Sequence, residues 1–173
     1  MHLSDLPSFV SSIAVVVTLV FLLIQTRQTN RNQKALMQQG RTARWIDIIL
    51  NRTTPSISAI LNQASQADST LDGSQIGTVL AQYGALFWSI EDSFLQYQSG
   101  LLDEMSWKTE LSSLRFNLSI PEVRVVWKIV RQFSGGDYAA FVDTLLLEIK
   151  PQKPPAMEEI WKDLMMQEMA QTA

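Results

Sequence analysis

Several residue types that usually carry chemistry are missing or scarce in this chain. It has no cysteine and only one histidine, His2. Without cysteine it can form no disulfide, no thiolate metal site and no cysteine nucleophile. One histidine near the N-terminus excludes the paired Glu-x-x-His ligands of di-iron bundles and a histidine-based triad in the rest of the chain. We therefore expect no metal and no cofactor.

Glycine and proline are also sparse, with seven and six among 173 residues. The prolines stand where helices would begin or linkers would run, which disfavours a turn-rich all-β protein. Hydrophobic residues make up 46% of the chain and charged residues 18%, a balance typical of a folded rather than a disordered protein. We expect an all-α fold.

A long uncharged run lies near the N-terminus. The segment FVSSIAVVVTLVFLLI covers residues 9–24, and Leu6 and Pro7 extend it to residues 6–24. As a helix it would measure about 28 Å, close to the thickness of a bilayer core. The alternatives are a cleaved signal peptide, for which the basic n-region is missing, and a buried helix, for which the remaining chain is too small. We expect a retained transmembrane helix.

Basic residues are distributed unevenly around this run. Residues 1–8 contain no Lys or Arg, whereas Arg27, Arg31, Lys34, Arg41 and Arg44 follow it. The positive-inside rule then predicts a short external N-terminus at residues 1–5 and a cytoplasmic domain. The expected location is a bacterial inner membrane, crossed once.

Residues 25–52 are expected to continue the helix as a basic juxtamembrane extension. Four basic residues share one face and form a candidate membrane interface: Arg27, Arg31, Lys34 and Arg41. They would contact anionic headgroups, or they would act only as a topology signal. The other side is expected to turn apolar and pack on the domain through four residues: Leu36, Ala43, Ile46 and Leu50.

The remaining chain is acidic. Residues 1–52 hold six basic and two acidic residues, a net charge of +4, whereas residues 53–173 hold eight and fifteen, a net charge of −7. The acidic part would repel phosphate, so we expect no nucleic acid partner. The expected partners are the lipid bilayer and another protein or further copies of the chain.

Residues 53–149 are expected to form a helical bundle. Four helix starts are marked by capping or turn residues: Thr54-Pro55, Asp103, Pro121-Glu122 and Gly135-Gly136-Asp137. Asp72-Gly73-Ser74 is expected to break the chain before a further helix, whose apolar stripe begins at Ile76. The β-branched run that begins at Val123 would also suit a strand, but its spacing favours a helix. The buried face of that helix is expected to consist of Val123, Val126, Val130 and Phe133.

The last part of the chain differs from the bundle in composition. KPQKPP at residues 150–155 is expected to be an extended linker, followed by an amphipathic, Met-rich helix over residues 156–173. The candidate partner-binding residues of this helix are Met157, Ile160, Trp161, Leu164, Met165 and Met169. Docking on another protein and packing on its own bundle are both open.

Glu91 is the candidate for a semi-buried carboxylate, because it lies beside the apolar stripe of its helix. Such a group could act as a general acid or base. An ion pair with Arg115 or Arg124, or plain solvation, is the alternative. No phosphate loop, nucleophile elbow or ligand cluster accompanies Glu91, so we expect no catalytic residues and no enzyme.

Three segments resemble a widespread group of small bacterial membrane proteins. They are LVFLLIQTRQTNRNQKAL, LFWSIEDSFLQYQSGLLDEMSW and PEVRVVWKIVRQFSGGDYAAFVDTLL, and the resemblance covers residues 9–147. It implies a single N-terminal span before a helical domain and implies no particular activity. The linker and final helix depart from the pattern of the group.

We therefore expect a single-pass, membrane-anchored helical interaction protein, acting as an accessory, assembly or scaffold subunit of a membrane complex. The alternative is a membrane-tethered sensor or regulator that binds a small ligand or signalling partner between its helices.

Overall fold

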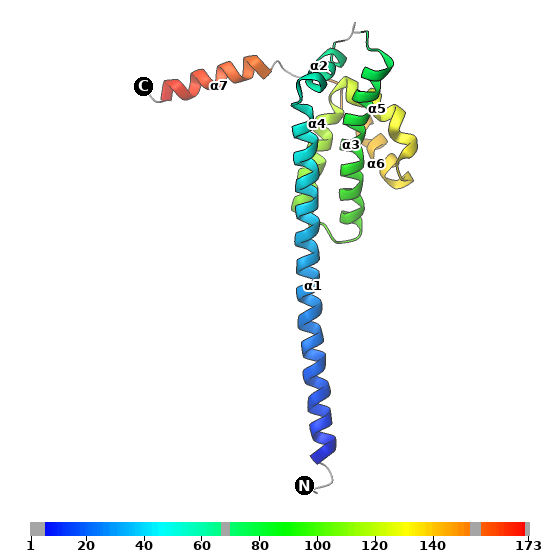
Figure 1. Cartoon of the computed structure of the whole chain (residues 1–173), viewed down its shortest axis with the longest axis vertical. Helices are drawn as coiled ribbons and strands as arrows, with labels where there is room; N and C mark the ends of the chain where they lie inside the picture. Colours follow the sequence, from blue (N-terminus) through cyan, green and yellow to red (C-terminus); the bar gives the residue numbers. More distant parts are fainter. Residues whose placement is uncertain (1–5, 67–69, 153–156, 172–173) are drawn as a thin grey trace. The chain divides into compact units, whose positions relative to one another are not determined.

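The computed structural model describes residues 6–66, 70–152 and 157–171, and this part of the chain is helical and contains no strand (Figure 1). The all-α prediction is confirmed. The α-helices are α1 (Leu6–Arg52), α2 (Pro55–Ala64), α3 (Gly73–Gln98), α4 (Glu104–Leu118), α5 (Pro121–Val130), α6 (Gly136–Glu148) and α7 (Met157–Gln171). A short 3₁₀ helix, η2, covers Arg131–Phe133. The expected external N-terminus and residues 153–155 of the linker lie outside the described residues.

The helix α1 is continuous through the predicted span and the predicted juxtamembrane extension. Among the described residues it is the one helix long and apolar enough to cross a membrane, and 0% of its most apolar window is buried. The chain divides into two compact units, Met1–Ala43 and Arg44–Ala173. The last residues of α1, from Arg44 to Arg52, therefore belong to the bundle.

Capping residues explain where the helices of the bundle begin. The Asp72 carboxylate accepts from the Gln75 backbone N–H at 2.9 Å, and the Gln75 side chain accepts from the Asp72 N–H at 2.9 Å, which is a capping box. Asp103 accepts from the Ser106 N–H at 2.9 Å and caps α4. The helix α3 stops ahead of Gly100, whose φ of +69° suits a residue without a Cβ. Proline occupies the first turn of two further helices: Pro55 in α2 and Pro121 in α5.

The core is organised around α3, which packs against α2, α4 and α5. The Phe87 ring lies 4.8 Å from the Trp127 ring, and the Phe94 ring lies 5.5 Å from Tyr138 and 5.8 Å from Trp107, measured between centroids. These contacts connect α3 to α4, α5 and α6. Each aromatic pair adds ~0.5–1.5 kcal/mol beyond the area that it buries.

The side chain of Arg124 ties the ends of two helices together. Its guanidinium donates to the carbonyl oxygens of Leu118, Leu146 and Ile149, at 3.2, 3.2 and 2.9 Å. Those carbonyls lie in the last turns of α4 and α6, where they lack partners within the helix. Arg124 therefore caps the C-terminal ends of α4 and α6.

Phe133 is a correction to the predicted buried face of α5. Its side chain is 69% exposed, whereas Val123, Val126 and Val130 are buried as predicted. The α-helix ends at Val130, and the next three residues form η2. A 3₁₀ helix has three residues per turn, so Phe133 is rotated away from the stripe that α-helical spacing predicts.

The face of α1 that meets the bundle was also predicted wrongly. Leu36, Ile46 and Leu50 are 66%, 49% and 61% exposed, and Ala43 is exposed as well. The half-buried positions at the end of α1 are Trp45, Ile48 and Arg52. Trp45 packs against the hydrophobic core and donates to Glu110, and the Arg52 guanidinium lies 5.2 Å from the centre of the Tyr83 ring. The face with these residues, and not the apolar stripe, is therefore the packing face at the end of α1.

Candidate functional site

Buried polar groups hold the last turns of α1 against α3 and α4. The Trp45 indole Nε1 donates to the two carboxylate oxygens of Glu110 at 3.1 and 3.3 Å. The Gln82 amide donates to the Ile48 carbonyl at 3.1 Å and accepts from the Asn51 amide at 3.0 Å. Glu110 and Gln82 are both buried, and buried polar groups are stable only when they are hydrogen-bonded in this way.

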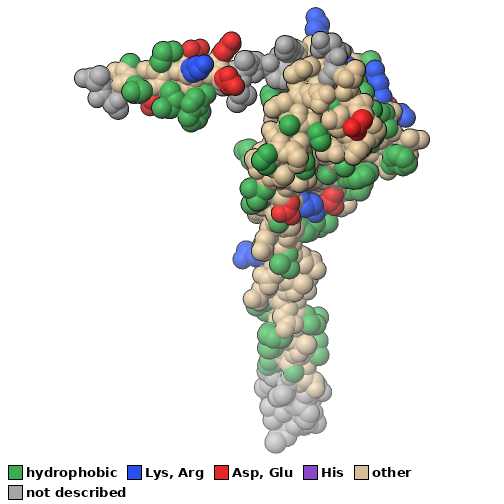
Figure 2. Space-filling model, turned by 45° about the horizontal axis from the view of Figure 1, so that its top comes forward, with side chains coloured by type: hydrophobic (Ala, Val, Ile, Leu, Met, Phe, Trp, Pro, Cys, Tyr) green, Lys and Arg blue, Asp and Glu red, His purple; other side chains and the backbone are tan. Residues whose placement is uncertain are grey.

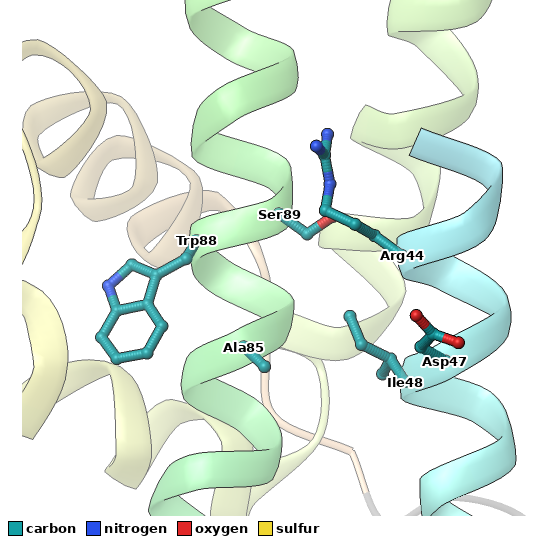
Figure 3. A pocket seen from close by; sticks show the side chains of 6 residues that line it. All are labelled: Arg44, Asp47, Ile48, Ala85, Trp88 and Ser89. Atoms are coloured by element: carbon teal, nitrogen blue, oxygen red, sulfur yellow. The ribbon is translucent and has the colours of Figure 1, made fainter. Parts of the chain in front are cut away.

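A shallow groove lies beside this contact, between α1 and α3 (Figure 3). Its volume is about 350 Å³. It is lined by Arg44, Asp47, Ile48, Ala85, Trp88 and Ser89.

Two of the groove residues stand out: Trp88 is a large aromatic residue that is half exposed, and Ser89 is a buried polar residue whose hydroxyl is unpaired among the described residues. The Trp88 side chain is 50% exposed, which is high for a large aromatic residue in a bundle. The Ser89 side chain is buried, and its hydroxyl has no hydrogen-bond partner among the described residues. Arg44 is engaged in an ion pair with Asp92. The Ser89 hydroxyl is enclosed, so what the groove exposes to a small, mainly apolar ligand is the Trp88 indole.

Glu91 is half-buried, and it contacts the start of α6. Its Oε1 accepts from the Gly135 backbone N–H at 2.6 Å, where the positive end of the helix dipole favours a carboxylate. The ion pairs considered for Glu91 do not form, because Arg115 pairs with Glu148 at 2.9 Å and Arg124 binds backbone carbonyls. Glu91 thus has a structural contact that explains its position.

The nearby phenol of Tyr138 is buried and donates to the Phe87 carbonyl at 3.2 Å. Burial raises the pKa of Tyr138 far above its ordinary value of 10.0, and the carboxylates of Glu91 and Glu110 raise it further. A phenol held neutral in this way is a structural donor and a poor general base. Among the described residues, no group of three or more His, Cys, Asp or Glu could hold a metal ion.

The predicted membrane-interface residues fall into two sets. Arg27, Arg31 and Lys34 are exposed on α1, whereas the Arg41 side chain is only 9% exposed. A buried guanidinium cannot reach lipid headgroups without leaving its site. The structure therefore groups three of the four predicted residues and sets Arg41 apart.

The apolar residues of α7 are exposed. Trp161 and Met169 are 68% and 66% exposed, and Leu164 and Met165 are 54% and 43% exposed. Ile160 is half-buried, and the side chain of Met157 lies outside the described ones. Figure 2 shows hydrophobic side chains on the surface of α7 and acidic ones near its N-terminal end.

The predicted site did not include three buried polar residues. Glu110 lies three residues after Trp107 and four before Leu114, so helical spacing alone places it on the buried face of α4. Gln82 and Ser89 lie seven residues apart, at two turns of α3, within its buried stripe. A polar residue at a core position is the signal that would have found them.

The fold defines the class of protein: an all-α bundle with one N-terminal helix that is long and apolar enough to span a membrane. No family model matches the chain, and neither a curated protein nor a solved structure matches it.

Proposed function

We propose that this chain is a single-pass, membrane-anchored helical interaction protein, an accessory, assembly or scaffold subunit of a membrane complex. The observation that carries the proposal is the exposure of the apolar part of α1. Val17, Leu19 and Phe21 are 62%, 60% and 57% exposed. Each such side chain gains about 1.5–3 kcal/mol on leaving water, so a bilayer is the environment that this surface fits.

The charges next to the apolar part support an orientation. Exposed Arg27, Arg31 and Lys34 follow it on α1, and basic residues remain on the cytoplasmic side. The proposal therefore has the N-terminus outside and the bundle in the cytoplasm, at the inner membrane of a bacterium. The three side chains are then positioned to contact anionic headgroups.

The interaction role rests on α7. Its exposed Trp161, Leu164 and Met165 are residue types that fill the centres of protein interfaces. The bundle itself lacks a histidine or cysteine that could act as a nucleophile or base. A role in binding, with no reaction of its own, is the simplest account of these features.

The test is to express the full-length, tagged protein and purify it from its native membrane in mild detergent. We expect it to resist alkaline carbonate extraction and to retain a partner at fixed stoichiometry. Trp161→Ala combined with Met165→Ala should release that partner, whereas the matched exposed change Glu159→Ala should not. Extraction by carbonate, or a partner retained by the α7 variant, would contradict the proposal.

The orientation of the chain in the membrane can be measured separately with a reporter fusion. A reporter fused after Ala173 should behave as a cytoplasmic one, and Arg27→Gln, Arg31→Gln and Lys34→Gln together should produce a mixed orientation, because they remove the charges that define the inner side. Periplasmic activity of the unaltered fusion would overturn the topology.

A second candidate function is ligand sensing in the groove between α1 and α3. The half-exposed Trp88 indole in the lining of the groove favours it. A ligand that binds the folded state raises the melting temperature according to its concentration and affinity. Screening small amphiphiles against the full-length protein would detect it, with Trp88→Ala expected to weaken the shift and Ser112→Ala, on the exposed face of α4, expected to leave it unchanged.

A further inference from the structure

Two apolar side chains at the end of α1, Ile46 and Leu50, are exposed in the structure. At the end of α1, Trp45 and Ile48 are half-buried against the bundle, whereas Ile46 and Leu50 remain 49% and 61% exposed. Successive residues of an α-helix are rotated by about 100°, which places Ile46 and Leu50 on the far side of the helix from Ile48. Both side chains are therefore accessible to a contact outside the bundle.

The stripe follows a heptad repeat along α1. Steps of three and four residues alternate from Val15 to Leu50, which is the spacing of a coiled-coil interface. We call these residues the seam. Its a positions are Val15, Leu22, Thr29, Leu36, Ala43 and Leu50, and its d positions are Thr18, Gln25, Asn32, Gln39 and Ile46, all of them exposed.

The charged side chains of α1 are placed so that two copies of the seam can meet without charge repulsion. All six basic residues of α1 fall at the outer b, c and f positions of the repeat: Arg27, Arg31, Lys34, Arg41, Arg44 and Arg52. The a and d positions of the seam carry no charged side chain, and the one charged residue at its flanking e and g positions is Asp47. In a parallel symmetric pair each a and d residue meets its own copy, so a charge at those positions would be repelled by its copy.

The polar seam residues also favour a second copy of this chain. Gln25, Asn32 and Gln39 recur once per heptad at d positions. An amide both donates and accepts hydrogen bonds, so two identical amides can pair across a symmetry axis, which two carboxylates or two ammonium groups cannot do. Such polar layers define the register of coiled coils and join helices in membranes.

We propose that α1 is a self-association element, which forms a parallel coiled coil with a second copy of the chain through the seam. The inference rests on the proposed function, because insertion with one topology is what makes the copies parallel. Leu at a combined with Ile at d shifts coiled coils toward three or four strands. The number of copies is therefore part of the measurement.

The absence of native cysteine makes disulfide trapping a direct test. Single cysteines would replace Leu36, Gln39 or Ala43 in the seam, and Lys34 or Gln38 at outer positions as controls. A disulfide requires Cα atoms about 4.4–6.8 Å apart, a distance that a parallel coiled coil provides only at its a and d positions. In oxidised native membranes we expect several-fold more covalent dimer for the seam variants. Equal yields, or a maximum at the outer positions, would overturn the proposal.

A second measurement does not depend on cysteine. The combination Ile46→Glu and Leu50→Glu places like charges at the seam and changes only side chains that lie outside the bundle contact. We expect the detergent-solubilised protein to fall to monomer mass in light scattering while its helical circular dichroism is kept. Gln38→Glu, at an outer position, should keep the mass of the unaltered protein.

The outcomes separate this inference from the proposed function. If the chain resists carbonate extraction but Leu36→Cys crosslinks to a different protein, only self-association is wrong. If seam cysteines pair while carbonate releases the protein, the coiled coil stands and the membrane anchor is wrong.

Discussion

The Trp45 indole Nε1 lies 3.1 and 3.3 Å from the two carboxylate oxygens of Glu110 and donates to both. Trp45 belongs to α1 and Glu110 to α4, so one hydrogen-bonded pair joins the last turns of α1 to the middle of the bundle. The carboxylate is buried, and a buried carboxylate without donors is costly. This contact should therefore contribute measurably to folding.

We expect Trp45→Phe to lower the free energy of unfolding by about 1.5–3 kcal/mol, the range for a hydrogen bond to a charged group. The effect should shrink when Glu110→Gln is already present, because the acceptor is then no longer charged. Denaturant titration of the four members of this cycle, as full-length protein in micelles, gives the coupling. If the effects of Trp45→Phe and Glu110→Gln on the free energy of unfolding are strictly additive, the two side chains are not coupled and the prediction is wrong. Trp161→Phe on α7 is the matched control.

Arg124 offers a second test, because its guanidinium binds three carbonyls at once. Arg124→Lys keeps the charge but loses the planar fork, so it should lower the melting temperature by several degrees, equivalent to roughly 1–2 kcal/mol. Thermal unfolding followed by circular dichroism measures the change. Lys128→Met, on the exposed face of α5, should have little effect. If Arg124→Lys has the same melting temperature as the unaltered protein, the contacts of Arg124 with the three carbonyls contribute nothing to stability.

Gly135 is predicted to be needed for the close approach of Glu91. A Cβ added at Gly135 would lie 3.2 Å from Glu91 Oε1, whereas one added at Gly136 would meet nothing within 4 Å. We expect Gly135→Ala to destabilise the protein by ~1 kcal/mol through the weakened hydrogen bond, and Gly136→Ala to be neutral or stabilising. The penalty at Gly135 should disappear in the Glu91→Ala background. If Gly135→Ala still destabilises the protein in the Glu91→Ala background, the cause is the backbone at Gly135 and not the contact with Glu91.

Acid stability should depend on Asp143. The Arg131 guanidinium bonds this carboxylate and holds its pKa below the ordinary value of 3.8, with a further bond from the Trp127 indole at 3.0 Å. The folded state then binds fewer protons than the unfolded state near that pH, so the stabilisation is present above pH 3.8 and is lost as the pH falls through the lowered pKa.

The free energy of unfolding, measured from neutral pH downward, should therefore fall less steeply in Asp143→Asn than in the unaltered protein. Arg131→Gln should reduce the slope in the same way, since it removes the main cause of the lowered pKa. If the free energy of unfolding depends on pH in the same way in all three proteins, the ion pair of Arg131 and Asp143 makes no contribution to acid stability.

Most helix positions could be predicted because the signals that start helices are local. Pro55, Asp103 and Pro121 act on neighbouring backbone groups within one turn, and each stands at the start of a helix in the structure as it does in the prediction. The packing face of α1 could not be obtained in this way. Periodicity shows that Ile46 and Leu50 form a stripe, but it does not say which surface covers that stripe.

The candidate site was missed for a related reason. Glu110 and Gln82 bind groups on α1 that are 65 and 31 residues away along the chain, and no local pattern links them. Helical spacing places Ser89 in the buried stripe of α3, but only the structure shows that its hydroxyl has no hydrogen-bond partner among the described residues. Hydrogen bonds between polar groups that are far apart in the sequence depend on the fold, and local sequence patterns do not predict them.

Because the turns of α1 from Arg44 to Arg52 provide partners for Glu110 and Gln82, the bundle includes the end of the helix that carries the apolar N-terminal segment. A recombination event that joined this bundle to a new N-terminal segment at Thr53 would deprive both side chains of these hydrogen bonds. Gene fusions that keep a folded bundle should therefore carry this stretch of α1 with it, so α1 and the rest of the bundle are inherited as one unit.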